Sequence, residues 1–330
     1  MATYDIERLP IGTKPDGSTA TISLKVHSLI AGTSGFGKSI LQQNVRIGAA
    51  HIENLAMIGI DPNLSELALW KDRYSFITKG VCCVEPLLDA LMTQMQLRMQ
   101  LLAMTGRKKV EPHEWGMLPL PNGALFPYPG ILVETDELAA VLSANDGKGD
   151  DVPRRNNYRR LAAEARKTSI MLISATQRLS ADLTPRSFTG NHANRLSVRT
   201  ANQAETVMVF DQKEEFLPAH ELPLDVKGLA YMTTEGDPKG TKFRSAFVPT
   251  RIEQENIRNG NDEAMKRAFG DVKTVEDFVE ETAHLRVPLP WLDEAMADHM
   301  AFHAGQEKAM QTMLNSMGVA DTSSGFSLRK

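Results

Sequence analysis

Residues 27–39 read HSLIAGTSGFGKS, which is the most informative local pattern in the chain. Its last eight residues match the phosphate-loop pattern G-x-x-x-x-G-K-[ST] at every fixed position. A short apolar run precedes the glycine-rich turn, and the helix-like sequence ILQQNVRIGAA follows it. The sequence therefore predicts a strand, a loop and a helix, with a nucleotide held by Gly32, Thr33, Ser34, Gly35, Phe36, Gly37, Lys38 and Ser39.

The residue types of this loop suit a nucleoside triphosphate. Glycine lets the backbone wrap its N–H groups around a phosphate, because a Cβ atom would clash with that curvature. Lys38 brings a positive charge to the β- and γ-phosphates, and Ser39 offers a hydroxyl to Mg²⁺. The following helix directs the positive end of its dipole at the phosphates. We therefore expect ATP and Mg²⁺ to bind here.

A second motif, GILVETDEL at 130–138, supplies the acidic residues that a phosphate-loop ATPase requires. Asp136 follows an apolar run, where a carboxylate can hold the water shell of Mg²⁺. Glu137 comes next, where it can orient and deprotonate the attacking water. Glu134 and Thr135 interrupt the apolar run, and we expect one of them to face a polar cavity or a subunit interface.

The chain up to about residue 250 alternates short apolar runs with helical patterns. Strand-like runs lie at 27–32, 55–61, 130–136, 169–176 and 195–200, and helix-like segments lie near 38–52, 86–105, 153–168 and 202–210. This alternation predicts an α/β fold with a mostly parallel sheet flanked by helices on both faces. Two later runs, 229–233 and 244–250, are expected to close the sheet, and a turn at 14–18 predicts an amino-terminal hairpin.

The character of the sequence changes after residue 250. Residues 251–286 are highly charged and helix-prone, and 291–317 form a Met-rich amphipathic pattern. We expect an ATPase motor domain at 1–250 and a small helical carboxyl-terminal appendage with a disordered end at 251–330.

Composition bears on the compartment and on the partner. The 330 residues carry a formal net charge of −4, so any contact with nucleic acid must come from a local basic patch. No run approaches 18 consecutive apolar residues, and the amino-terminus lacks the pattern of a signal peptide. The two cysteines, Cys82 and Cys83, are adjacent and indicate no disulfide framework. We therefore expect a cytoplasmic protein without a membrane span.

Several segments in the same order resemble the FtsK/SpoIIIE family of DNA translocases, within the FtsK–HerA group of P-loop ATPases. The segments are HSLIAGTSGFGKS at 27–39, IDPNLSELALWKD at 60–72, ILVETDELAAVL at 131–142, ARKTSIMLISATQRLS at 165–180, NHANRLSVRTANQAETVMVFD at 191–211 and KGLAYMTTEGDPKGTKFRSAFV at 227–248. The phosphate loop alone is generic, whereas Ala-Thr-Gln-Arg at this spacing is more specific.

The resemblance implies a RecA-like motor that assembles as a hexameric ring around double-stranded DNA. By position, Gln177 would sense the γ-phosphate and the attacking water. Arg195 would reach into the site of the neighbouring subunit as an arginine finger, which neutralises charge in the transition state. Ring assembly would then be a condition for hydrolysis.

A basic cluster between the acidic motif and Ala-Thr-Gln-Arg is a candidate contact for DNA. Binding without sequence preference requires little more than positive side chains at phosphate spacing. A solvated helix face or a subunit interface would explain the same charges at least as well. The cluster consists of Arg154, Arg155, Arg159, Arg160, Arg166 and Lys167.

Three functions fit these features. The first is an ATP-driven DNA pump, of a plasmid, phage or mobile element. The second is an ATPase or coupling protein of a protein-secretion or conjugation machine, whose helical appendage would bind a protein partner. The third is a nucleotide-dependent structural ring, against which Glu137 and Arg195 argue.

Overall fold

The computed structural model describes residues 4–63, 66–78, 80–81, 83–143, 153–182, 184–211, 217–259, 273–298 and 301. Contacts divide the chain into two compact units, Met1–Pro288 and Leu289–Lys330. The second unit contributes one described helical stretch, residues 290–298. The first unit holds the sheet and the sites discussed below.

Ten strands of the described chain form one sheet in the order β2-β1-β12-β11-β10-β3-β9-β8-β4-β5. The strands are β1 (Leu9–Thr13), β2 (Thr19–Ile22), β3 (Ser28–Ala31), β4 (Leu55–Ile60), β5 (Phe76–Ile77), β8 (Gly130–Thr135), β9 (Ile170–Thr176), β10 (Asn194–Ser197), β11 (Leu229–Thr233) and β12 (Thr241–Ser245). The predicted α/β fold is confirmed, and all five strand-like runs predicted before residue 201 are strands.

The half of the sheet from β10 to β5 is parallel. Strands β3, β4, β8 and β9 are buried at every position, as parallel strands covered on both faces must be. Strand β9 lies between β3, which leads into the phosphate loop, and β8, which carries the acidic motif. This is the additional strand of RecA-like ATPases, and it places the residues after β9 between the two motifs.

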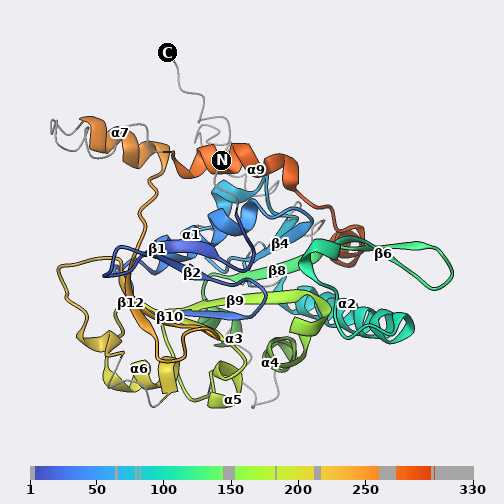
Figure 1. Ribbon diagram of the computed structural model, residues 1–330, viewed down its shortest axis with the longest axis horizontal. Helices are drawn as coiled ribbons and strands as arrows, with labels where there is room; N and C mark the ends of the chain where they lie inside the picture. The colour runs from blue at the N-terminus through green and yellow to red at the C-terminus, as the bar shows by residue number, and fades with distance from the viewer. Residues whose placement is uncertain are drawn as a thin grey trace, which may run out of the picture. The chain divides into compact units, whose positions relative to one another are not determined.

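The other half, from β10 through β11, β12 and β1 to β2, is antiparallel. The expected turn joins β1 to β2, with the N–H of Gly17 donating to the Lys14 carbonyl at 3.0 Å. The closing strand predicted at 244–250 lies a few residues earlier, at Thr241–Ser245, because this segment pairs with β11. A separate hairpin of β6 (Gly116–Pro119) and β7 (Leu125–Tyr128) projects beyond the sheet (Figure 1).

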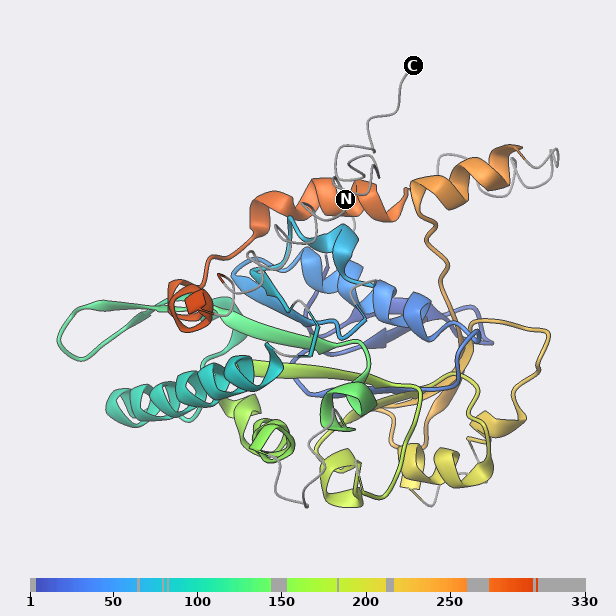
Figure 2. The same ribbon diagram turned by 180° about the vertical axis from the view of Figure 1, so that it is seen from behind.

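Helices cover both faces of the sheet (Figures 1 and 2). Helix α1 (Lys38–Ala50) and helix α9 (Val275–Thr282) lie on one face and contact each other. The opposite face is covered by α2 (Val84–Thr105), α3 (Leu138–Ser143), α4 (Pro153–Glu164) and α5 (Arg186–Thr189), with α6 (Gln203–Phe210) beside β10. No helix among the described residues is both long enough and apolar enough to span a membrane.

The boundary between the two compact units lies after Pro288, whereas the sequence predicted a domain boundary near residue 250. Helix α9 accounts for the difference, because Val275 and Val279 belong to the main hydrophobic core. Its start is fixed by the Thr274 side chain, which forms a capping box with Asp277. Helix α7 (Arg251–Asn259) is tied to α9 as well, through an ion pair of 3.0 Å between Arg251 and Asp277.

Candidate nucleotide and catalytic site

The phosphate loop joins the carboxyl end of β3 to helix α1. Gly32 has a φ of 141°, and a Cβ there would lie 2.2 Å from Cγ2 of Val198, so a side chain is excluded. The N–H and hydroxyl of Thr33 donate to the Arg199 carbonyl at 2.8 and 3.0 Å, which anchors the loop to the neighbouring strand segment. Gly37, with a φ of 99°, begins α1 in a left-handed conformation that glycine adopts without strain. The loop is thus pre-shaped by its own sequence and by the segment after β10.

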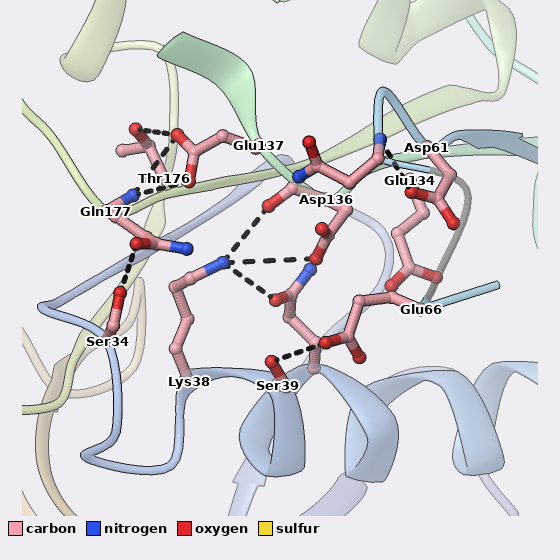
Figure 3. A network of polar contacts seen from close by, with 12 residues as sticks. Ser34, Lys38, Ser39, Asp61, Glu66, Glu134, Asp136, Glu137, Thr176 and Gln177 are labelled. Carbon is pink, nitrogen blue, oxygen red and sulfur yellow. Dashed lines mark hydrogen bonds and ion pairs between the residues drawn. The ribbon is translucent and has the colours of Figure 1, made fainter. Parts of the chain in front are cut away.

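Lys38 is buried at the start of α1, and its side chain extends toward the acidic motif, where the ammonium group contacts Asp136 (Figure 3). Nζ donates to Oε1 of Gln42 at 3.2 Å and to the Asp136 carbonyl at 3.1 Å. It also lies 3.9 Å from Oδ1 of Asp136. The two motifs predicted from separate stretches of sequence therefore meet in one site, with the cation between the loop and the acidic strand end.

Asp136 is 5% exposed, and its Oδ1 accepts no hydrogen bond from the described residues. The pKa of Asp136 is raised to about 6, chiefly by burial and also by the nearby carboxylates of Glu66, Glu134 and Asp61, while Lys38 opposes the shift. A buried carboxylate oxygen without a donor is a ligand that suits a hard cation such as Mg²⁺, and the serine hydroxyl of the phosphate loop is another. Ser39 and Asp136 would hold this ion, which supplies positive charge to the phosphates.

The raised pKa of Asp136 predicts that Asp136→Asn stabilises the nucleotide-free protein at neutral pH. The folded pKa of about 6 exceeds the usual value of 3.8, so the folded state binds the proton more tightly than the unfolded chain. The stabilisation from this proton is complete below about pH 4 and is lost as the pH rises through 6. The unfolding free energy of the variant relative to wild type should therefore increase over this range, by at most about 3 kcal/mol.

Denaturant titrations of both proteins from pH 4 to pH 8, without nucleotide or metal, measure this difference. A stability difference that stays constant over that range would show that Asp136 titrates at its ordinary pKa.

Glu137 lies at the start of α3 and faces the end of β9. Its Oε1 accepts the Thr176 hydroxyl at 2.8 Å, and its Oε2 accepts the Gln177 N–H at 3.0 Å. The Gln177 side chain in turn accepts a hydrogen bond from the Ser34 hydroxyl of the phosphate loop. Figure 3 shows Glu137 and Gln177 on one side of Lys38, and Ser39 on the other. The arrangement brings a carboxylate and an amide together between the phosphate loop and the end of β9.

The two unexpected polar residues of β8 point to opposite faces of the sheet. Glu134 accepts two hydrogen bonds from Arg46 of α1, at 3.1 and 2.6 Å, and a third from the Tyr74 hydroxyl. Thr135 contacts the hydroxyl of Tyr158 on α4 at 2.9 Å. Both side chains are satisfied inside the subunit, so the expectation of a cavity or an interface for one of them is wrong.

Two cavities adjoin the site. A cavity of about 510 Å³ opens on the phosphate loop and is also lined by Lys227, Arg244, Phe247 and Glu253. These four residues were missed by the sequence analysis, and Lys227 and Arg244 are cations that could contact phosphate. A second cavity, of about 670 Å³, lies on the other side of Gln177 and is lined by Glu137, Arg178 and Glu205, among others.

Arg195 does not point at the phosphate loop of its own subunit. It lies near the start of β10, opposite Leu29, whereas the loop follows the far end of β3. Its guanidinium forms an ion pair with Asp211 and donates to the carbonyls of His192 and Val209 at 3.1 and 3.2 Å. The side chain is 15% exposed.

The predicted basic cluster is divided between different environments. Arg154 is buried, with Nη1 3.5 Å from the Val141 carbonyl. Arg155 and Arg159 are half-buried and donate to the carbonyls of Leu142 and Asp182, at 3.3 and 2.7 Å. The exposed members are Arg160, Arg166 and Lys167. Arg160 pairs with Glu164. Arg166 and Lys167 line a separate cleft of about 390 Å³, together with Lys25, Lys108 and Lys109.

Of the cysteine pair, Cys83 is buried, and Cys82 lies outside the described residues.

The additional strand, the phosphate loop and the acidic motif together define a P-loop ATPase. The model of the FtsK/SpoIIIE family matches residues 5–181, more than half of the chain. The chain therefore belongs to the FtsK/SpoIIIE family.

Relatives of known name agree with this assignment. The chain is 30% identical over 270 residues to the DNA translocase FtsK of Streptomyces avermitilis, which covers 78% of this chain and 28% of that protein. It is 24% identical over 272 residues to the DNA translocase SftA of Bacillus subtilis, covering 76% and 28%. The chain thus spans little more than a quarter of the length of these curated relatives.

Solved structures show the same fold. The conjugation coupling protein TcpA of pCW3, in its monomer form with ATPγS, matches with a TM-score of 0.60 and 22% identity, over 74% of this chain and 68% of that one. The cytoplasmic domain of the type VII secretion ATPase EccC of Thermomonospora curvata matches with a TM-score of 0.64 and 21% identity, over 88% and 33%.

Proposed function

We propose that this chain is the motor of an ATP-driven translocase for double-stranded DNA, which works as a hexameric ring. The observation that carries the proposal is the arrangement of Lys38, Asp136, Glu137 and Gln177 around one site at the carboxyl edge of the parallel strands. Its relatives in the same family are named DNA translocases. A site built for hydrolysis, in a family with these relatives, favours a motor over a static ring.

In the proposed reaction, Lys38 leaves its contacts with Gln42 and the Asp136 carbonyl and binds the β- and γ-phosphates of ATP. Ser39 and Asp136 would hold Mg²⁺, which supplies positive charge to the phosphates. Glu137 orients the attacking water and accepts its proton, while Gln177 reports the presence of the γ-phosphate. Gln177 is hydrogen-bonded both to Glu137 and to Ser34 of the phosphate loop. A movement of Gln177 on loss of the γ-phosphate would therefore shift both the base and the loop.

The ring is the second element of the proposal. The cavity of about 670 Å³ beside Glu137 and Arg178 has room for a side chain of another subunit, which supports this element. Arg195 of a neighbouring subunit would enter such a site and neutralise the charge of the transition state. This requires Arg195 to exchange Asp211 for phosphate at the interface, and an ion pair with a half-exposed carboxylate is weak enough to exchange.

A second candidate function is a coupling or transport ATPase of a conjugation or secretion machine. The fold is shared with a conjugation coupling protein and a secretion ATPase. We propose a cytoplasmic motor for either case, with 251–330 as the appendage that binds a protein partner. A plasmid, phage or other mobile element is the proposed source of the DNA pump.

DNA-stimulated ATP hydrolysis separates the two functions. The purified chain is assayed for phosphate release alone, with duplex DNA of increasing length, and with single-stranded DNA. The DNA pump predicts stimulation by duplexes that depends on their length, together with a ring-sized species in native mass spectrometry. Hydrolysis that responds to no DNA would favour the transport ATPase.

Helix α4 provides a prediction about DNA binding. Arg155→Ala with Arg159→Ala should weaken binding to any duplex, leave basal hydrolysis unchanged, and lower the salt dependence of log K by about one per lost phosphate contact. The measurement is fluorescence anisotropy of a labelled duplex at salt concentrations from about 50 to about 300 mM. Over this range the release of counterions from DNA sets the salt dependence of binding.

Lys71→Ala is the matched control for this pair, because it removes an exposed cation that lies outside the basic cluster, and its duplex binding should equal that of wild type. Unfolding midpoints of all variants test whether loss of the bonds to Leu142 and Asp182 loosens α4. A salt dependence equal to that of wild type would place the DNA contact on another surface.

A further inference from the structure

Glu66 brings a further acidic side chain to the end of the site where Ser39 and Asp136 lie. The Ser39 hydroxyl donates a hydrogen bond to Oε1 of Glu66 at 3.1 Å. Figure 3 shows the two side chains facing each other beside Asp136, on the side of Lys38 opposite to Glu137. Nothing in the sequence motifs assigns a role to Glu66, which lies between β4 and the 3₁₀ turn Ala68–Trp70.

The position of Glu66 is fixed by buried groups rather than by a loose surface turn. Asp61, at the end of β4, accepts the N–H of Leu67 at 3.0 Å and of Asn63 at 3.2 Å, on its two carboxylate oxygens. The Glu66 carbonyl lies 3.4 Å from Nη1 of Arg46, whose guanidinium is held by the buried Glu134. Residues 66 and 67 are therefore held on two sides, by Asp61 at the end of β4 and by Arg46 of α1.

The direction of the Ser39 hydrogen bond matters for metal binding. A serine hydroxyl has one proton and two lone pairs, and its rotor otherwise turns freely. A metal ligand must offer a lone pair, so the proton must point away from the ion. With the hydroxyl proton directed at Oε1 of Glu66, the lone pairs of Ser39 are free for a cation, and the Glu66 carboxylate adds negative charge nearby. Groups that orient a metal ligand in this way typically contribute 10- to 100-fold in metal affinity.

We propose that Glu66 is a positioning residue for Mg²⁺, which acts by holding the proton of the Ser39 hydroxyl. The inference rests on the Mg²⁺-dependent ATP site of the proposed function, and it is independent of the polymer that the motor moves. Removal of Glu66 should weaken Mg²⁺ binding to the nucleotide complex without weakening the metal-free contact between nucleotide and loop.

Nucleotide affinity with and without metal tests this directly. The dissociation constant of a fluorescent ADP is measured in excess Mg²⁺ and in EDTA, and Mn²⁺ binding to the same complex is followed by electron paramagnetic resonance. For Glu66→Ala we expect the affinity in EDTA to change less than twofold and the tightening by Mg²⁺ to fall about 10- to 100-fold. Glu66→Gln should recover part of the loss, because the amide oxygen still accepts the proton while the charge is gone.

A double-mutant cycle with Ser39→Ala separates orientation from charge alone. If Glu66 acts through Ser39, Glu66→Ala should add little to the loss caused by Ser39→Ala. Asp72→Ala, which removes an exposed carboxylate six residues away, is the matched control and should behave as wild type.

Equal losses in Mg²⁺ and in EDTA, or fully additive losses with Ser39→Ala, would overturn the assignment of Glu66. Wild-type protein whose nucleotide affinity is insensitive to Mg²⁺ would overturn the proposed ATPase reaction as well. The two failures are distinct, because the second appears before any variant is made. If Glu66→Ala does not fold, Glu66→Met, which keeps the length of the side chain and removes the acceptor, completes the cycle with Ser39→Ala.

Discussion

Alanine at Lys38 and glutamine at Glu137 should both stop ATP hydrolysis, but they should differ at the binding step. Lys38→Ala removes the charged donor that the loop aims at the phosphates. A charged hydrogen bond of this kind contributes about 1.5–3 kcal/mol, so nucleotide affinity should fall roughly 10- to 150-fold. Turnover should be undetectable, since the same charge is needed in the transition state.

Lys38→Ala should also change the state of the acidic motif. Lys38 is the cation that lowers the pKa of Asp136 against the effect of burial. Without it, the pKa of the Asp136 carboxyl should rise above its present value of about 6, so a larger fraction is protonated at neutral pH, which weakens Mg²⁺ binding in addition to phosphate binding. Restoring the affinity should therefore require a higher pH for the variant than for wild type.

Glu137→Gln should leave binding intact. Glutamine keeps the size of the side chain, and its amide oxygen can still accept the Thr176 hydroxyl, which lies 2.8 Å from Oε1 of Glu137. The base is lost, and general-base catalysis is worth about 10²- to 10⁴-fold. The variant should thus bind ATP as tightly as wild type and retain it.

Fluorescent ATP binding and single-turnover phosphate release measure the two steps separately for both variants. Thr176→Val is a useful companion, because it removes one donor to Glu137 and keeps the carboxylate. Hydrolysis by Glu137→Gln at a rate near wild type would show that another group accepts the proton.

The parts of the site that the sequence predicted are those encoded by contiguous residues. The phosphate loop and the Asp136-Glu137 pair each sit at the end of an apolar run, and parallel strands bring such ends to one edge. The residues that were missed come from segments without a local signature. Glu66 follows β4 by a loop, and Lys227 and Arg244 come from the antiparallel half of the sheet.

Helix α4 shows a limit of a different kind. Its charges predicted a basic surface, but the buried face runs through Arg154, Tyr158, Leu161 and Ala162, at helical spacing. That period was present in the sequence and indicates that Arg154 faces the core. The fates of Arg155 and Arg159 could not be predicted, because their partners are backbone carbonyls of α3 and of the loop after β9.

Loss of Arg195 should lower turnover about 10³-fold or more while leaving ATP binding and assembly intact, if it acts across the subunit interface. The ion pair with Asp211 suggests a competing explanation, in which Arg195 only braces β10 against α6. Asp211→Asn distinguishes the two. A bracing role predicts similar losses for both variants, whereas a finger predicts that Asp211→Asn keeps most of the activity, because the arginine is released rather than removed.

Mixing mutant subunits tests the shared site itself. Glu137→Gln subunits have a dead site and an intact Arg195, and Arg195→Ala subunits have an intact site and no finger. In mixed rings some interfaces join a good site to a good finger, so duplex-stimulated phosphate release should partly return at concentrations that permit assembly. Arg178→Ala is mixed with Glu137→Gln in parallel, because Arg178 is exposed in the cavity beside Glu137. If activity returns in the mixture with Arg178→Ala but not in the mixture with Arg195→Ala, Arg178 is the arginine finger. With mixed assembly confirmed by native mass spectrometry, no recovery for either pair would mean that each subunit hydrolyses ATP with its own residues.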